Sequence, residues 1–269
     1  MSSLLTLENV NFSYNSKSEN NFQLKDISFN VDEGDFISVI GKNGSGKSTL
    51  IKLISGIVTS YSGNVKLLGN DIRNLDSKQY SRFVSYVPQS AGVLNDNLKV
   101  NELLLLGRYP FKNFFDFRNS AKDFEVVNSA MEETGIKHFS GRVLSDLSGG
   151  ERQKVMLTLA LVQLNIMEKP KNKILIIDEP VTHLDVNYQV EIFRILKKLN
   201  ETGLTIIIVI HDLSSALNYT SKTILMNAGT LVSYSDTRKV ITENILREHF
   251  LIESRILSYE NKFLINFSL

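Results

Sequence analysis

A glycine-rich segment between an apolar run and a helical pattern constrains the fold of this chain more than any other feature. Residues 36–40 read Phe-Ile-Ser-Val-Ile, the near-continuous apolar pattern of a strand that is covered on both faces. Gly41 follows directly, and residues 47–57 have apolar side chains at helical spacing. The chain therefore predicts a strand, a glycine loop and a helix in succession. In open α/β sheets, ligands bind outside the carboxyl ends of such strands.

The glycine loop fits the pattern GxxxxGK[ST] over residues 41–48. Glycines let the backbone curl so that successive N–H groups point at phosphate oxygens, and the following helix adds its positive end. We expect Lys47 to reach the β- and γ-phosphates of a nucleotide and Ser48 to ligate Mg²⁺. The residues predicted to contact the nucleotide here are Gly41, Asn43, Gly44, Ser45, Gly46, Lys47, Ser48 and Thr49. A glycine turn without a ligand is the alternative, which the flanking strand and helix disfavour.

Two more buried strands are predicted late in the chain, over residues 174–177 and 205–210, and each ends in polar residues. Asp178 and Glu179 follow the first of them. Hydrolysis of a nucleotide needs a carboxylate beside the γ-phosphate that is not bound to the metal, and two adjacent acids can divide these roles. We expect Asp178 to hold Mg²⁺ through water and Glu179 to act as the base that polarises the attacking water. An acidic pair is weak evidence alone and strong evidence beside a phosphate loop.

Residues 147–153 read LSGGERQ and open a predicted helix. The hydroxyl of Ser148, the amides of Gly149 and Gly150 and the helix dipole could together bind an anion. The same residues could be a plain N-cap with a glycine hinge, since Ser148 and Glu151 have the spacing of a capping box. In isolation the pattern favours the cap.

The phosphate loop, the LSGGE-type segment and the acidic pair, in this order, resemble the nucleotide-binding subunit of an ATP-binding-cassette (ABC) transporter. The resemblance covers nearly the whole chain and implies an α/β fold: a P-loop NTPase (RecA-like) core with an N-terminal antiparallel β subdomain and an inserted α-helical subdomain. The expected boundaries are 1–238 for the ATPase domain, about 90–165 for the helical subdomain, and 239–269 for a C-terminal tail packed on the domain. Period-two alternation over residues 5–10 and 27–31 supports the antiparallel strands, and helical spacing predicts helices over 100–106, 121–134 and 150–163.

The resemblance also assigns roles to single residues. Gln89, in Tyr-Val-Pro-Gln, matches the glutamine that contacts Mg²⁺ and the attacking water, and His211 matches the switch histidine that contacts the γ-phosphate. Asp185, in Thr-His-Leu-Asp, matches the aspartate that communicates across a dimer. Tyr14 matches the aromatic residue that stacks on adenine, with Phe12 or Phe22 as core neighbours that could be mistaken for it. The residues implied in catalysis are Glu179, His211, Gln89 and Lys47; those implied as metal ligands are Ser48, Gln89 and Asp178.

Composition restricts the cellular setting. The net charge is +1, which gives no global field to attract nucleic acid, and the absence of cysteine excludes disulfides and thiol chemistry. The N-terminus lacks the pattern of a secretory signal, and the longest apolar runs are far shorter than the roughly 20 residues of a membrane helix. We therefore expect a soluble protein that reaches the cytoplasmic face of a membrane only through a partner.

Within the family, a single cassette without a coiled-coil insert, a second cassette or fused membrane helices fits an importer with separate permease subunits. Residues 106–110 (LGRYP) and 181–189 (VTHLDVNYQ) resemble the import ATPases for iron-siderophores, haem and cobalamin. The implied ligands are ATP and Mg²⁺. The implied partners are a second copy bound head-to-tail around two ATP molecules, permease subunits and an extracytoplasmic substrate-binding protein, with no nucleic acid. Import of haem, cobalamin or a metal ion, or a soluble non-transport ABC ATPase, are the alternatives.

A few features depart from this pattern or have a simpler explanation. Related chains often carry Ala-Arg-Ala after the LSGGE-type segment, whereas residues 157–161 read LTLAL, and the missing arginine is expected to weaken ion pairing inside the helical subdomain. Residues 108–118, rich in Phe and basic side chains, could mimic a nucleic-acid platform, but this region is expected to form the helical subdomain. His138 and His249 are expected to be surface or cap residues, and the Lys197-Lys198 pair is expected to be the solvated face of an amphipathic helix over residues 188–199.

Overall fold

The computed structural model describes residues 3–14, 23–89, 97–113, 118–166, 168, 170–182, 184–260 and 262–267. The chain divides into two compact units. The first unit consists of Met1–Asn74 and Ile207–Leu269, and the second unit is Leu75–Ile206.

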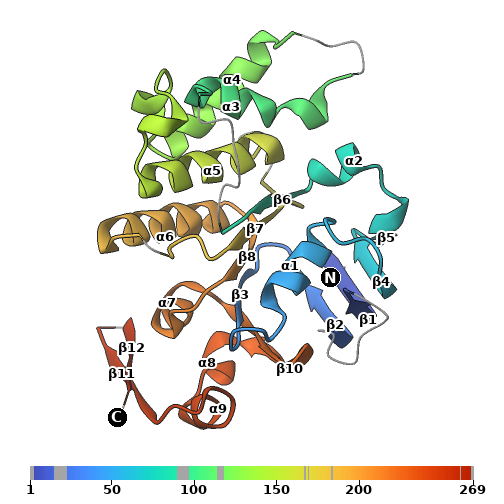
Figure 1. Ribbon diagram of the computed structural model, residues 1–269, viewed down its shortest axis with the longest axis vertical. Coiled ribbons are helices and arrows are strands. Elements are labelled where there is room, and N and C mark those ends of the chain that lie inside the picture. The colour runs from blue at the N-terminus through green and yellow to red at the C-terminus, as the bar shows by residue number, and fades with distance from the viewer. Residues whose placement is uncertain are drawn as a thin grey trace. The chain divides into compact units, whose positions relative to one another are not determined.

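The first unit begins with an antiparallel sheet whose strand order is β2-β1-β4-β5 (Figure 1). Its strands are β1 (Leu5–Ser13), β2 (Gln23–Val31), β4 (Ser62–Leu67) and β5 (Asn70–Asp71). Leu5, Leu7 and Val10 are buried while the intervening Thr6 and Glu8 are not, so the alternation in the sequence matches one covered face. The predicted N-terminal antiparallel strands are confirmed.

A second group of strands in the first unit carries the glycine loop. β3 (Phe36–Ile40) lies between β9 (Lys222–Asn227) and β8 (Thr205–Val209), and it pairs parallel with β9. The last three residues of β8 belong to this unit. β10 (Thr230–Asp236) pairs antiparallel with β9. Every residue of β3 and β8 is buried, as their continuous apolar runs predict.

The helices of the first unit are α1 (Lys47–Ile54), α7 (Leu213–Tyr219), α8 (Thr237–Val240) and α9 (Glu243–Ile245). The helix predicted over residues 47–57 ends earlier, at Ile54. The reason is Gly56, which has φ of +77° and lets the N–H groups of Ile57 and Val58 turn back to the carbonyl oxygen of Lys52.

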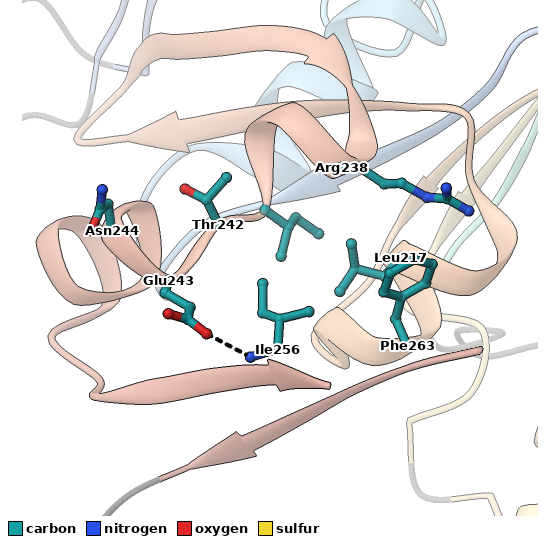
Figure 2. A pocket seen from close by; sticks show the side chains of 8 residues that line it. Leu217, Arg238, Thr242, Glu243, Asn244, Ile256 and Phe263 are labelled. Carbon is teal, nitrogen blue, oxygen red and sulfur yellow. Dashed lines mark hydrogen bonds between the residues drawn. The ribbon is translucent and has the colours of Figure 1, made fainter. Parts of the chain in front are cut away.

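The C-terminal residues of the first unit form a hairpin that packs on α7. β11 (Ser254–Tyr259) pairs antiparallel with β12 (Lys262–Phe267). The amide of Asn218 on α7 donates to the carbonyl oxygen of Phe263 and accepts from its N–H, both at 2.8 Å. A pocket of about 390 Å³ lies between the hairpin, α7, α8 and the segment after α8. Figure 2 shows the side chains that line it, and none of them belongs to the predicted nucleotide site.

The second unit contains a parallel pair of strands, β6 (Val84–Val87) and β7 (Ile174–Asp178), and five helices in its described residues. The helices are α2 (Ser77–Ser81), α3 (Val100–Leu106), α4 (Ala121–Glu133), α5 (Gly149–Leu164) and α6 (Val186–Glu201). The three helices predicted over 100–106, 121–134 and 150–163 are confirmed as α3, α4 and α5. The inserted helical subdomain over about 90–165, with its boundaries, stays a prediction, because β6 and β7 belong to the same unit.

Short helical turns complete both units: η1 (Ile72–Asn74), η2 (Tyr109–Phe111), η3 (Lys137–Phe139), η4 (Leu144–Asp146) and the π-helical η5 (Leu246–Phe250). Across the described parts of the chain, no helix combines the length and the apolar character that crossing a membrane requires.

An apolar cluster joins α3, α4 and α5 within the second unit. Its helical members are Val100, Leu103, Leu104, Val126, Val127, Ala130, Met131, Val155 and Val162. Because α5 begins with the LSGGE-type segment, this cluster fixes the helix that presents it.

A buried ion pair lies beside this cluster. Arg108 is 3% exposed, and its Nε donates to Asp123 Oδ1 at 2.9 Å. Its Nη1 donates to the carbonyl oxygen of Val162 and to Asn165 Oδ1, each at 3.3 Å, and its guanidinium lies 4.2 Å from the Phe111 ring centroid. The guanidinium is thus enclosed by protein atoms and unavailable to nucleic acid. Residues 114–117 of the basic segment lie outside the described residues.

Candidate functional site

The glycine loop joins β3 to α1 in a conformation that requires glycine. Gly41 has φ of +149°, and a Cβ atom built on it would lie 2.3 Å from the backbone oxygen of Met226 on β9. Gly46, the N-cap of α1, has φ of +107° and makes no side-chain cap hydrogen bond. The N-terminus of α1 therefore has no side-chain cap, and the N–H groups at such a helix end are suited to binding an anion.

Lys47 and Ser45 line the inside of this loop. Lys47 is 6% exposed, and its Nζ donates to the carbonyl oxygens of Gly41 at 2.9 Å and Lys42 at 3.2 Å. The hydroxyl of Ser45 is buried and has no hydrogen-bond partner in the described structure. A buried ammonium group and an unsatisfied hydroxyl in a loop of curled backbone fit the binding of phosphate. The neighbouring Ser48 is exposed and offers a hydroxyl oxygen of the kind Mg²⁺ prefers.

Tyr14 lies next to the helix that follows the glycine loop. Its hydroxyl is 3.3 Å from the hydroxyl of Thr49, and its side chain is 54% exposed. Phe12 is buried and meets the Tyr14 ring edge-on, with the centroids 4.8 Å apart. Of these two rings, only that of Tyr14 has an open face for stacking. Phe22, the third aromatic residue near this position in the sequence, lies outside the described residues.

His211 is exposed at the end of the segment that continues β8. The N–H of Ile210 donates to the carbonyl oxygen of Val39 at 3.3 Å, so the chain leaves the sheet alongside the end of β3. Asp212 then caps α7, accepting from the N–H groups of Ser214 at 3.1 Å and Ser215 at 3.0 Å. This cap fixes the turn that carries the histidine.

In the second unit, the structure brings Gln89 and Glu179 together from positions far apart in the chain. Gln89 Nε2 donates to Glu179 Oε2 at 2.7 Å, and the hydroxyl of Thr182 donates to the same oxygen at 3.3 Å. Glu179 has φ of +48°, an unusual backbone conformation for a residue with a side chain. This turn directly after β7 aims the carboxylate at its two donors.

Asp178 ends β7 and is 5% exposed. The hydroxyl of Tyr86, on the neighbouring β6, donates to Asp178 Oδ2 at 3.3 Å. Burial and the negative charge of Asp178 hold the pKa of the Tyr86 phenol well above its ordinary value, so it remains a donor. Sequence reasoning missed both Tyr86 and Thr182, although a tyrosine on a buried strand needs a partner for its hydroxyl.

Ser148 caps α5 as the alternative interpretation of LSGGE predicts. The N–H of Ser148 donates to Glu151 Oε2 at 2.7 Å, and the N–H of Glu151 donates to Ser148 Oγ at 3.3 Å. The backbone N–H of Ser148 is the main cause of the lowered pKa of the Glu151 carboxyl, and Arg142 adds to it. The N-terminal glycine Gly149 is exposed, so an anion could still reach the end of the helix.

Asp185 is the N-cap of α6 and accepts from the N–H of Tyr188 at 3.0 Å. This cap is a structural role, and the role of Asp185 across a dimer stays a prediction. His183, quoted in the same motif, lies outside the described residues.

The predicted site residues thus fall into two groups. The first unit holds Tyr14, residues 41–49 and His211; the second unit holds Gln89, Asp178, Glu179, residues 148–150 and Asp185. Among the residues that the structure describes, no three acidic or histidine side chains cluster as metal ligands.

A buried parallel strand that runs through GxxxxGKS into a helix defines a nucleotide-binding α/β protein of the P-loop NTPase class. The chain belongs to the ABC transporter family, whose pattern matches residues 24–182. As a member, it is an ATP-binding cassette with ATPase activity.

Two relatives and one solved structure illustrate the similarity. The chain is 34% identical over 236 residues to the iron(3+)-hydroxamate import ATP-binding protein FhuC of Bacillus subtilis, covering 87% of this chain and 84% of that protein. It is 32% identical over 234 residues to the ferric enterobactin transport ATP-binding protein FepC of Escherichia coli, covering 87% and 83%. An inward-facing metal-chelate type ABC transporter superposes with a TM-score of 0.81 at 25% identity, covering 99% of this chain and 97% of that one. The predicted fold class is confirmed.

Proposed function

We propose that this chain is the ATP-hydrolysing subunit of an importer that takes up a ferric siderophore or a similar iron complex through separate permease subunits. The similarity to the hydroxamate and enterobactin proteins supports this cargo. The described site residues would contact the nucleotide and not the transported substrate, so haem, cobalamin or a metal ion is the second candidate for the cargo. The protein would work at the cytoplasmic face of the membrane, together with an extracytoplasmic substrate-binding protein.

The bound nucleotide would be held by the loop of residues 41–49. Its amides and the ammonium group of Lys47 would bind the phosphates, and the open face of Tyr14 would stack on adenine. Ser48 and Asp178 would hold Mg²⁺, which supplies neutralisation of the charge on the phosphate oxygens when bound. The buried, unsatisfied hydroxyl of Ser45 supports a ligand in this loop.

The contact between Gln89 and Glu179 is the observation that carries the hydrolytic role. Glu179 would accept a proton from the attacking water, and Gln89 would orient that water and contact the metal. His211 would contact the γ-phosphate. Because Gln89 and Thr182 both donate to Oε2, they would hold the carboxylate in a fixed orientation for this step.

Two copies would associate head-to-tail around two ATP molecules. In this arrangement Ser148, Gly149 and Gly150 of one copy would bind the nucleotide held by the other, and Asp185 would lie near the dimer axis. Because the chain carries both halves of such a site, both sites would be competent. Dimer closure would move the permease, and hydrolysis would reset it.

Uptake of labelled ferric siderophore tests the proposal in cells that carry either the intact chain or Glu179→Gln as the only copy. Loss of uptake with retained membrane association is the expected result. Equal uptake by both would refute this cargo. A protein that never co-purifies with membranes would instead favour a soluble, non-transport ABC ATPase.

The purified protein tests the mechanism. Glu179→Gln should bind ATP, hydrolyse it very slowly and dimerise with it; a monomeric, fully active variant would refute the assigned base. Lys47→Ala should lose ATP binding, and unchanged affinity would refute the phosphate contact.

A further inference from the structure

The LSGGE-type segment lies against an aromatic ring from another helix. A Cβ atom built on Gly150 would be 2.7 Å from Tyr188 Cγ and 2.9 Å from each Cδ, so the ring lies over the Cα of this glycine. Gly150 does not have a positive φ, so its backbone conformation does not demand glycine. It is the ring of Tyr188 that leaves no room for a side chain at Gly150. At Gly149, by contrast, an added Cβ would meet no described atom within 4 Å.

Tyr188 is itself held in place by the residue predicted to communicate across the dimer. Asp185 caps α6 by accepting from the N–H of Tyr188, which fixes the first turn of that helix. One turn further along both helices, Lys154 Nζ forms an ion pair with Glu191 Oε1 at 2.7 Å, and the Lys154 side chain is 6% exposed. The N-terminal turns of α5 and α6 are thus joined at two successive levels.

We propose that Tyr188 is a positioning residue for ATP-driven dimerisation. Its ring sets the position of the first turn of α5, and therefore of the N–H groups that Ser148, Gly149 and Gly150 would present to the nucleotide of the partner copy. Because Asp185 fixes Tyr188, a shift of the segment before α6 moves this turn with it. The proposal rests on the head-to-tail dimer described under Proposed function.

The test uses Glu179→Gln as the parent, with Tyr188→Ala and Tyr188→Phe added separately. Affinity for a fluorescent ATP analogue is measured on dilute monomer, and ATP-dependent dimerisation by sedimentation velocity. Tyr188→Ala should keep the monomer's affinity for the nucleotide within about twofold, since the phosphate loop is unchanged. It should weaken dimerisation about tenfold or more, because displaced N–H groups at the start of α5 would bind the partner copy's nucleotide poorly. Tyr188→Phe should behave as the parent, because the ring makes the contact.

Tyr259→Ala serves as a matched control, because this tyrosine is 69% exposed on β11; it should dimerise as the parent does. Parent-like dimerisation of Tyr188→Ala, or an equal loss in Tyr188→Phe, would overturn the role of the ring. If Tyr188→Ala does not fold, Tyr188→Leu replaces it, with reduced dimerisation expected and parent-like dimerisation refuting. A parent that stays monomeric with ATP would overturn the proposed dimer itself, and this role with it.

Discussion

Truncating Asp123 to alanine should destabilise the second unit by about 3–5 kcal/mol, the cost of leaving a buried charge without its partner. The side chains of Arg108 and Asp123 are only 3% and 11% exposed. Asp123 also accepts from the N–H of Ser120 at 2.9 Å and from its hydroxyl at 2.8 Å, as part of the N-terminal cap of α4. The variant therefore loses an ion pair and a helix cap together, and the guanidinium keeps its neutral acceptors, the carbonyl oxygen of Val162 and Asn165 Oδ1.

The loss should depend on pH in a defined direction. Burial raises the pKa of the Asp123 carboxyl, but hydrogen bonds from Arg108 and Ser120 outweigh it and lower the pKa below its ordinary value. A carboxyl with a lowered folded pKa stabilises the protein above its unfolded pKa, about 3.9, and loses this contribution as the pH falls through the folded pKa. The difference in the free energy of unfolding between wild type and Asp123→Ala should have its full value at pH 7 and should shrink below about pH 4.

Urea unfolding followed by circular dichroism measures both effects. The matched control is Glu132→Ala, which removes the ion pair with Lys137 on the surface, where the two side chains are 58% and 62% exposed. This variant should lose less than about 1 kcal/mol. A loss below about 1 kcal/mol in Asp123→Ala at pH 7, or an equal loss at pH 7 and at the acid end, would refute the reasoning.

Three further substitutions address the nucleotide site. Gly41→Ala places a methyl group 2.3 Å from a backbone oxygen of β9 and should lower ATP affinity at least about tenfold in equilibrium dialysis. Gly44→Ala has open space around the added methyl group, so it should cost about 1 kcal/mol of backbone strain and reduce ATP affinity less than Gly41→Ala does. Thr182→Val removes a donor to Glu179 and should lower kcat about three- to tenfold with KM unchanged, whereas Thr182→Ser should retain activity; equal kcat in both would contradict the contact. Tyr14→Ala should weaken ATP binding several-fold and Tyr14→Phe much less, because stacking needs the ring; equal affinities would exclude stacking.

The arrangement of strands and helices around the glycine loop could be predicted from the sequence because its determinants are local. β3 is buried along its whole length and α1 starts at Lys47, as apolar pattern and glycine spacing indicate. The end of α1 could not be fixed, since the pattern continues to Ile57 while Gly56 ends the helix. Helix ends depend on one residue's conformation rather than on periodicity.

The pairwise contacts of the site could not be predicted. Motif spacing selected Gln89 and Glu179, but the direct hydrogen bond between them depends on where the chain after β6 lies. The donor from Tyr86 to Asp178 and the ring of Tyr188 on a glycine of α5 likewise join separate elements. Such pairings follow from packing between elements, which hydrophobic periodicity does not specify.

The left-handed backbone of Glu179 lowers the stability of the fold at the position where a carboxylate is present. Any side chain with a Cβ atom pays roughly 1–2 kcal/mol to adopt this conformation, and glycine would adopt it freely. The residue that would make the turn after β7 most stable is therefore not one that could take a proton from water. The cassette therefore has a carboxylate at a position where glycine would give a more stable fold. The burial of every residue of β7 offsets the conformational cost of this turn.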